Sequence, residues 1–442
     1  MQDEFRYQQR GIWRTLGIPR QLIWGYVGIF LFLTGATIEQ SWLASLLAAE
    51  GYSELQISMA SSAFGLTVTL ASWFSGIGSQ VYGVRRMMWA GTLVFFVTSV
   101  PFVLFALPAK NYYAIVITYM LRGIAYPLFA YSFLVWINLC AEKAILGRAV
   151  SWFWSAFAVG MTILGPWFSS LAIPLIQERG VLLVGFLLVG AGAFAALVIN
   201  RDRPRVAAAT ENTYRAFAQG ILIMFQEPKL GLSVIVKTIN DIGKFSLIIL
   251  MPIYLPRFGF SLSEWLTIWS SVNLLNLFSG YFFGYLSDLI GWRKTVVLFS
   301  GTLCSTSAIL VCYAPVWFGH SPLAVFLALS VYAIGLGAFG PLAALIPALS
   351  PHNKGAAISC LNLGSGLSNF VGPLIVSLCI MPIGVEGTLW VIALLYFLAS
   401  LLTIPLKTPE ETHSVWTDPM AVDKFCPHDE ACSKASGLTP PR

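Results

Sequence analysis

The sequence predicts an all-α polytopic membrane protein of twelve transmembrane helices, arranged as two parallel six-helix halves. Three observations support this fold class: the composition, the long apolar segments and an internal repeat of about 208 residues. Of the 442 residues, 57% are hydrophobic and only 10% are charged, whereas soluble domains carry about 25% charged residues. A soluble chain of this length would need far more polar surface. The composition therefore excludes a disordered chain, a secreted disulfide scaffold and a nucleic-acid-binding protein.

The apolar segments are long enough to cross a bilayer, which takes about 20 mostly apolar residues. We expect twelve spans, over residues 22–47, 57–78, 87–107, 112–140, 149–173, 181–199, 230–255, 265–286, 295–314, 323–349, 355–381 and 388–406. These spans divide the chain into an N-terminal segment 1–21, a first half 22–199, a central loop 200–229, a second half 230–406 and a disordered tail 407–442.

The basic residues predict which side each loop faces. An even number of spans puts both termini on one side, and 20 of the 26 Lys and Arg residues then fall on that side. The loops of the opposite side hold three, and three more lie inside helices. Because basic residues gather in cytoplasmic loops, both termini, the central loop and the tail are predicted to be cytoplasmic, in a multi-pass protein of the cell inner membrane.

The internal repeat relates the two halves residue by residue. At offsets of 207 to 209, five motifs recur in chain order, which pair Pro19-Arg20 with Pro228-Lys229, Gly51-Tyr52-Ser53 with Gly259-Phe260-Ser261, Gly76 to Arg85 with Gly284 to Arg293, Gly147-Arg148-Ala149 with Gly355-Ala356-Ala357, and Gly165-Pro166 with Gly372-Pro373. Two six-helix repeats of the same topology predict a transporter whose site lies between the halves near the middle of the membrane, reached alternately from either side.

A glycine-rich segment between the eighth and ninth spans resembles the loop motif of the major facilitator superfamily. It runs GYLSDLIGWRK from Gly284 to Lys294 and includes Asp288, Gly291 and Arg293. Its copy in the first half keeps Gly76, Gly83 and Arg85 but has Gln80 in place of the acid. The resemblance implies the fold of that superfamily, with these residues at the gate on the cytoplasmic face.

A narrower resemblance points to the polyol permease branch, which includes ribitol and D-arabinitol transporters. It is carried by the segment GIAYPLFAYSFLVW from Gly123 to Trp136, and by four shorter motifs: WFW at 152–154, KTIN at 237–240, NKGAA at 353–357 and NLGSG at 362–366. The resemblance implies proton-coupled uptake of a sugar alcohol by alternating access, without enzyme activity. Relatives that transport 2-oxoglutarate leave a dicarboxylate as the alternative substrate. Less favoured readings are drug efflux by antiport and a sensor that binds its ligand without moving it.

Energy coupling is expected to use the proton gradient, with no cofactor and no metal. The chain lacks a phosphate-binding loop for ATP, and its four histidines all lie in loops or the tail. A side-chain proton carrier must therefore be a carboxylate within a helix, which leaves Glu39 and Asp241. The expected partners are a small-molecule substrate, protons and the lipid bilayer, without nucleic acid, and the protein is expected to be a monomer.

Ionisable side chains inside membrane helices are costly and mark functional sites. There are five, namely Glu39, Arg122, Lys237, Asp241 and Lys244. Glu39 is the preferred proton carrier, and the alternative is a permanently charged partner of Arg122. On the seventh span, Lys237, Asn240, Asp241 and Lys244 fall at i, i+3, i+4 and i+7, which is one helix face. This face is predicted to line the cavity, with a self-neutralising Lys–Asp–Lys network as the alternative.

Further polar and aromatic side chains complete the predicted substrate site. Amides and hydroxyls suit a polyhydroxylated ligand because each can donate and accept hydrogen bonds, although helix-to-helix hydrogen bonds are an equal alternative. The candidates for substrate binding are Arg122, Tyr126, Trp152, Lys237, Asn240, Lys244, Asn273, Asn276, Asn362 and Asn369. With two acids and three bases, the cavity would carry a charge of about +1, which slightly favours the organic acid.

Overall fold

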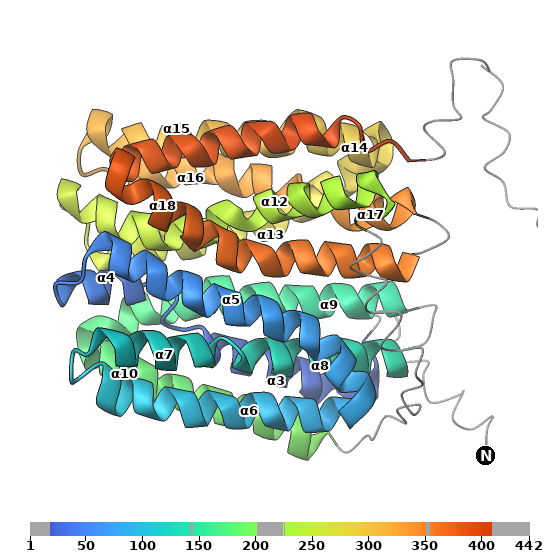
Figure 1. Cartoon of the computed structure of the whole chain (residues 1–442), viewed down its shortest axis with the longest axis horizontal. Helices are drawn as coiled ribbons and strands as arrows, with labels where there is room; N and C mark the ends of the chain where they lie inside the picture. Colours follow the sequence, from blue (N-terminus) through green and yellow to red (C-terminus); the bar gives the residue numbers. More distant parts are fainter. Residues whose placement is uncertain (1–17, 142–144, 201–223, 225, 351–353, 409–442) are drawn as a thin grey trace, which may run out of the picture. The chain divides into compact units, whose positions relative to one another are not determined.

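The computed structural model describes residues 18–141, 145–200, 224, 226–350 and 354–408, and within them all regular structure is helical (Figure 1). The first half contains η1 (Arg20–Leu22), α3 (Ile23–Ala36), α4 (Leu43–Ala49), α5 (Glu54–Gly78), η2 (Ser79–Gly83), α6 (Val84–Pro101), η3 (Phe102–Ala106), α7 (Tyr112–Arg122), α8 (Ala125–Cys140), α9 (Leu146–Ala158), η4 (Val159–Leu164), α10 (Gly165–Phe194) and η5 (Ala195–Ile199). The second half contains α12 (Pro228–Tyr254), η6 (Leu255–Phe258), α13 (Leu262–Ile290), α14 (Trp292–Thr295), η7 (Val296–Ser300), α15 (Gly301–Phe318), α16 (Pro322–Gly337), α17 (Leu342–Leu349) and α18 (Lys354–Thr403).

The helices lie side by side in an all-helical bundle that extends to Leu406 (Figure 1). The predicted tail 407–442 and central loop 200–229 fall mostly outside the described residues. Helices suit a bilayer because they satisfy every backbone polar group internally. Large apolar side chains, such as Leu93 at 64% exposure and Leu187 at 74%, face outward. In the described part, seven helical stretches are long and apolar enough to cross a membrane. Of these stretches, Arg148–Ile199 contains the two predicted spans 149–173 and 181–199, and Cys360–Thr403 overlaps the two predicted spans 355–381 and 388–406.

The repeat seen in the sequence recurs in the backbone. Gly51 and Gly259 have φ of +91° and +86°, and Gly83 and Gly291 have +91° and +97°. These four positions lie in the left-handed region that glycine alone adopts without strain. Each pair is separated by 208 residues, so each half turns in the same way between its helices. The repeat is therefore present in the backbone as well, as two parallel halves of the same topology require.

Three predicted spans are broken rather than continuous, which corrects their expected form. Span 22–47 is divided by turns at 37–42, span 112–140 at Gly123 and Ile124, and span 323–349 at 338–341. Proline explains two of the breaks, because it has no N–H to donate to the carbonyl four residues earlier. Pro127 leaves the Gly123 carbonyl without that donor, and Pro341 leaves the Gly337 carbonyl without it. The first two breaks flank the charged pair described below.

The two ends of the bundle are distinguished by their loops. We call the end that carries Gly83 and Gly291 the motif end, and the end that carries Gly51 and Gly259 the far end (Figure 1). Helix α5 runs from the far end to the motif end, and α18 begins at the motif end.

Candidate functional site

A buried ion pair joins the first and fourth spans. The Arg122 guanidinium donates from Nη2 to Glu39 Oε2 at 2.8 Å, and the side chains are 3% and 0% exposed. Glu39 lies in the turn between α3 and α4, and Arg122 is the last residue of α7. Both residues therefore sit where a helix is interrupted, which is where membrane transporters commonly place ion and substrate sites.

Aromatic rings surround the guanidinium of this pair. The Arg122 Cζ atom lies 5.1 Å from the centre of the Phe95 ring and 5.5 Å from that of Phe102, within the range of cation–π attraction. Glu39 Oε1 and the Arg122 atoms Nε and Nη1 are buried without a hydrogen-bond partner in the described residues. Arg122 therefore points into the first half, toward Glu39 and these rings.

The polar face of α12 forms a second charged cluster. The Lys237 ammonium donates to Asn240 Oδ1 at 2.7 Å and to Asp241 Oδ2 at 3.0 Å. The Lys237 and Asp241 side chains are 16% and 23% exposed, and Asn240 is buried. The predicted sharing of one helix face is thus observed for these three side chains, and the Lys237–Asp241 pair neutralises itself.

Lys244 completes this face, and among the described residues it has no hydrogen bond or ion pair of its own. In the described part of the chain its ammonium contacts the Phe245 ring, at 5.5 Å from the ring centre, and no carboxylate lies within salt-bridge distance of it. Its charge interacts with Asp241 and Lys237 over a longer distance. Two ammonium groups thus share one carboxylate, and the cluster keeps a net charge of about +1.

A cavity of about 210 Å³ lies between the two halves, on the motif-end side of the bundle. It is lined by Thr69, Ser72, Trp73, Ser75, Gly76, Tyr131, Leu134, Val135, Trp154, Asn362, Leu363 and Ser365. Tyr131 and Ser72 line this cavity together, and Tyr131 interacts electrostatically with Asp241. A Cβ added at Gly364 would lie 2.8 Å from Lys237 Cβ, so the α12 cluster adjoins the cavity wall formed by α18.

Hydrogen bonds between the halves lie on the far-end side of this cavity. Thr69 Oγ1 donates to the Gly366 carbonyl at 2.7 Å, and the Tyr126 hydroxyl donates to Asn369 Oδ1 at 3.4 Å. The hydroxyl oxygens of Ser62 and Ser377 are 3.4 Å apart, within hydrogen-bond distance. Tyr126 and Asn369 thus meet as a pair across the interface, and neither lines the cavity in this conformation.

Among the described residues, three hydrogen bonds join the halves at the far end. Arg257 Nη2 donates to Glu54 Oε1 at 2.7 Å on the surface. Trp265 Nε1 donates to the Ser41 carbonyl at 3.0 Å in the interior, and Ser263 Oγ donates to the Ser170 carbonyl at 2.9 Å. A molecule in the cavity therefore has these contacts between it and the far end.

The two loop-motif arginines perform equivalent tasks in the two halves. Arg85 donates to the Asn200 carbonyl at 2.8 Å and to the Leu197 carbonyl at the end of η5. Arg293, 208 residues later, donates to the Ile404 carbonyl at 3.1 Å, just beyond α18. Cations at helix C-termini complement the unpaired carbonyls there. Each arginine thus ties the start of its half's third span to the end of the sixth.

The other loop-motif residues show more local contacts. Asp288 Oδ1 accepts a hydrogen bond from Trp292 Nε1 at 3.4 Å, within the motif. Gly76 lines the cavity, whereas a Cβ added at Gly284 would meet nothing within 4 Å.

Some predicted substrate residues lie away from the cavity. Trp152 is 43% exposed and is not part of the lining, whereas Trp154, two residues later, is. Asn273 is buried, and its side chain donates to the Trp269 carbonyl on its own helix. Asn276, one turn later, is also outside the lining. Of the predicted amides, Asn362 lines the cavity.

Most of the lining residues are not among the predicted substrate residues, including Thr69, Ser72, Ser75 and Tyr131. The hydroxyls of α5 occur at Thr69, Ser72 and Ser75 with spacings of three, and this polar stripe in an apolar helix was a signal available in the sequence.

Comparison with known proteins agrees with this arrangement. Residues 25–348 and 234–422 match the Major Facilitator Superfamily. The chain is 41% identical to the alpha-ketoglutarate permease of Bacillus subtilis (strain 168), over 91% of this chain and 93% of the permease. It is 35% identical to the ribitol transporter of Klebsiella pneumoniae (87% and 92%), and 33% identical to the D-arabinitol transporter of the same organism (90% and 95%).

Solved structures show the same fold. The inward open conformation of the xylose transporter XylE from E. coli superposes with a TM-score of 0.66 at 15% identity, covering 90% of this chain and 99% of that one. A crystal structure of a D-xylose-proton symporter gives 0.68 at 16% identity, covering 88% and 97%.

The family match and the permease and transporter relatives show a multi-pass membrane transporter, not an enzyme. The chain belongs to the major facilitator superfamily.

Proposed function

We propose that this chain is a proton-coupled symporter of a small organic anion, whose carboxylate binds at the positive cluster on α12. The observation that carries the proposal is the charge balance of that cluster. Lys237 is paired with Asp241 at 3.0 Å, and Lys244 has no ion-pair partner in the described residues. An unpaired ammonium in a membrane interior is costly, and an anionic ligand would remove that cost.

The relatives support an anion as well. The name of one of them, at 41% identity over 91% of this chain, gives alpha-ketoglutarate as its substrate. A dicarboxylate of that size could place one carboxylate at Lys244 and the other near the polar groups of the cavity. Ser72, Asn362 and Ser365 line that cavity and supply hydroxyl and amide groups for the second end.

A polyol such as D-arabinitol or ribitol is the second candidate. The amides and hydroxyls of the cavity favour it, because a polyol needs groups that both donate and accept hydrogen bonds. Relatives named for ribitol and D-arabinitol, at 35% and 33% identity, support the same reading. In this case Lys237, Asp241 and Lys244 would act as a structural network rather than as ligand-binding residues.

Proton coupling is assigned to Glu39. Its carboxylate is fully buried, holds one hydrogen bond from Arg122 and keeps Oε1 unpartnered. Protonation would release Arg122 from this ion pair, so the pair can exist in two charge states that differ in how α3, α4 and α7 are held together. Asp241 remains bound to Lys237 and is the second candidate carrier.

The membrane orientation follows from the charges of the loops. We propose that the motif end faces the cytoplasm of the cell inner membrane, because the basic residues of the sequence gather on that side. The structure then corresponds to a state that is closed toward the outside and has its cavity on the inner side.

The experiment that decides the substrate is uptake into proteoliposomes that hold the purified protein, with an inward proton gradient. Labelled 2-oxoglutarate and labelled D-arabinitol are compared for the parent protein and for Lys244→Gln. Loss of one charge-assisted hydrogen bond costs about 1.5–3 kcal/mol, so we expect the KM for 2-oxoglutarate to rise about 10-fold to 150-fold.

The matched control is Lys294→Gln, because Lys294 lies in the loop motif and outside the cavity. This control is expected to leave the KM unchanged. Accumulation of D-arabinitol but not of 2-oxoglutarate, at an unchanged KM in Lys244→Gln, would replace the anion by the polyol.

A further inference from the structure

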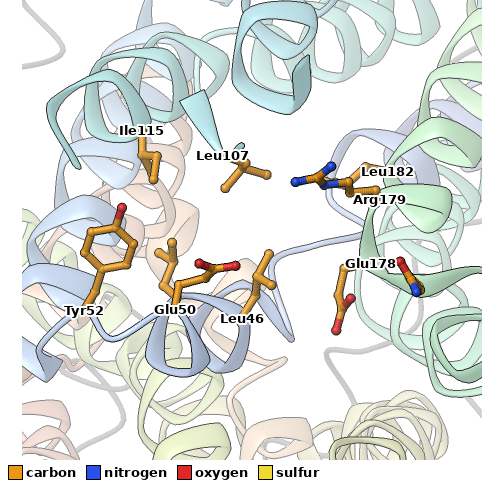
Figure 2. Close-up of a pocket in the computed structure, with 10 residues that line it drawn as sticks. Leu46, Glu50, Tyr52, Leu107, Ile115, Glu178, Arg179 and Leu182 are labelled. Carbon is orange, nitrogen blue, oxygen red and sulfur yellow. The ribbon is translucent and has the colours of Figure 1, made fainter. Parts of the chain in front are cut away.

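A second cavity, of about 250 Å³, lies at the far end of the first half and outside the interface between the halves (Figure 2). It is lined by Leu46, Leu47, Glu50, Tyr52, Leu107, Ile115, Gln177, Glu178, Arg179 and Leu182. These residues come from α4 and the turn that follows it, from the residue after η3, from α7 and from α10 at its bend. We call this cavity the vestibule.

The mouth of the vestibule is polar and its floor is apolar. Figure 2 shows the Glu50 carboxylate and the Arg179 guanidinium on opposite sides, with Leu46 and Leu107 nearby. Glu50 forms an ion pair with Lys110 at the rim. The Tyr52 hydroxyl is buried and has no hydrogen-bond partner in the described residues. Buried polar atoms of this kind are normally satisfied by water, so the vestibule is a place where water is expected.

The floor of the vestibule leads toward the buried ion pair. Ile115, Tyr119 and Arg122 fall at i, i+4 and i+7 on α7, which is one helix face, and all three are buried. Ile115 lines the vestibule, and Arg122 holds Glu39. Tyr119 lies between them and interacts electrostatically with both members of the pair.

Tyr119 is fixed in this position by ring stacking. Its ring centre is 4.4 Å from that of Phe64 and 5.6 Å from that of Phe102. In this conformation the vestibule therefore ends at Ile115, about two turns of α7 before the ion pair.

Beyond Tyr119, toward the ion pair, several buried polar atoms have no hydrogen-bond partner among the described residues. Glu39 is fully buried and Arg122 is 3% exposed, yet Glu39 Oε1 and Arg122 Nε and Nη1 lack partners among the described residues. The Ser99 hydroxyl is also buried and unpartnered. Ser99 lies on α6, between Phe95 and Phe102 in the sequence. The rings of these two phenylalanines cover the Arg122 guanidinium. Buried polar atoms normally have a hydrogen-bond partner in the protein or in ordered water, so water is expected at these atoms.

The second half provides an internal comparison, because the repeat places Tyr254, Phe258 and Phe260 where the vestibule has Leu46, Glu50 and Tyr52. Tyr254 and Phe260 are 1% and 4% exposed, and the rings of Tyr254 and Phe258 pack at 5.2 Å.

The same offset of 208 residues places Leu247 and Ser330 opposite Glu39 and Arg122. The half that lacks the ion pair thus has aromatic rings in place of the polar mouth. Because aromatic side chains occupy the corresponding positions of the second half, the shared fold does not by itself require the vestibule.

We propose that protons from the far side reach Glu39 through this vestibule, by a route separate from that of the substrate. A hydronium ion in the vestibule gives up a proton to the Glu39 carboxylate and leaves a water molecule, and the Glu39–Arg122 ion pair is lost. The stacked rings of Tyr119, Phe64 and Phe102 close the route in the present conformation. They must move apart in another conformation for a proton to pass. The inference rests on the proposed role of Glu39 as proton carrier.

The test is to block the vestibule and to compare two transport assays in proteoliposomes. Leu46 is replaced by Trp in one variant, and in another by Cys that is then treated with a membrane-impermeant thiol reagent from the far side. Ala48→Cys is the matched control, since Ala48 is exposed on the same helix and does not line the vestibule. The substrate is whichever of 2-oxoglutarate and D-arabinitol the parent protein accumulates.

Accumulation driven by the proton gradient requires net proton entry, whereas counterflow exchange of labelled for unlabelled substrate does not. We expect both blocked variants to lose at least 10-fold in the rate of proton-driven accumulation and to keep counterflow within about 2-fold of the parent. Unchanged accumulation in the blocked variants, or an equal loss in both assays, would overturn the proposal.

Glu39→Gln, measured in parallel, separates this proposal from the one on which it rests. If Glu39→Gln still accumulates substrate against its gradient in response to protons, the assignment of the proton carrier is wrong. If Glu39→Gln loses accumulation while the blocked variants keep it, the carrier stands and the vestibule route fails.

Discussion

Removing one partner of the buried Glu39–Arg122 pair should destabilise the protein more than removing both. The two side chains are 0% and 3% exposed and joined at 2.8 Å, so neither solvent nor salt screens them. Loss of one member of such a pair leaves an uncompensated buried charge, at a cost of about 3–5 kcal/mol. Replacing both removes the charges together, and the cost of the double change is therefore expected to be much smaller.

The measurement is a double-mutant cycle with Glu39→Gln, Arg122→Gln and the double variant. The free energy of unfolding of each purified protein is obtained by titrating mixed micelles with a denaturing detergent. We expect Arg122→Gln to lose about 3–5 kcal/mol and the double variant to regain at least about 2 kcal/mol of that loss. If the free-energy changes of the two single substitutions added up to that of the double variant, the two side chains would not compensate each other and the reasoning would fail.

Three further predictions concern the two ends and the interface of the bundle. Arg257→Ala removes an exposed ion pair to Glu54 that is worth at most about 1 kcal/mol. We therefore expect the rate of thiol labelling, at cysteines introduced at the far end, to rise by no more than about 5-fold. A larger rise would show that this ion pair dominates the closure of the far end. A Cβ at Gly65 would lie 1.8 Å from the Asn369 carbonyl oxygen, so Gly65→Ala should separate α5 from α18 and abolish counterflow at normal expression; normal counterflow would contradict this packing. Glu264 caps α13, and the hydrogen bond from the Ser261 backbone lowers its pKa below the usual 4.5. The stabilisation from a lowered pKa is present above the ordinary pKa and is lost as the pH falls through the native value. Glu264→Gln should therefore be less stable than the parent at pH 7, and the difference should shrink as the pH falls below 4.5. Thermal unfolding at a series of pH values measures this, and a difference that does not change with pH would contradict it.

The charges and the repeat made the fold class and the partners on α12 predictable from the sequence. Lys237, Asn240 and Asp241 occur at helical spacing in an otherwise apolar segment, and helix geometry alone brings them together. Contacts within one helix depend on spacing, which a sequence displays directly.

The partner of Glu39 could only be offered as an alternative, since Arg122 is 83 residues away. Periodicity does not indicate which face of one helix meets which face of another. The same limit explains why Trp152 was chosen instead of Trp154, because both lie on an aromatic-rich helix and only the packing of α9 decides which one reaches the cavity.

The sequence by itself determined the membrane class, the two related halves and the positions of the left-handed glycines, because these depend on hydropathy and local backbone preference. Tertiary structure decided three other features. It broke the first span at 37–42, it left Lys244 without a partner among the described residues, and it opened the vestibule in the first half. Each of these depends on side chains that are distant in the chain and fill, or fail to fill, the same space.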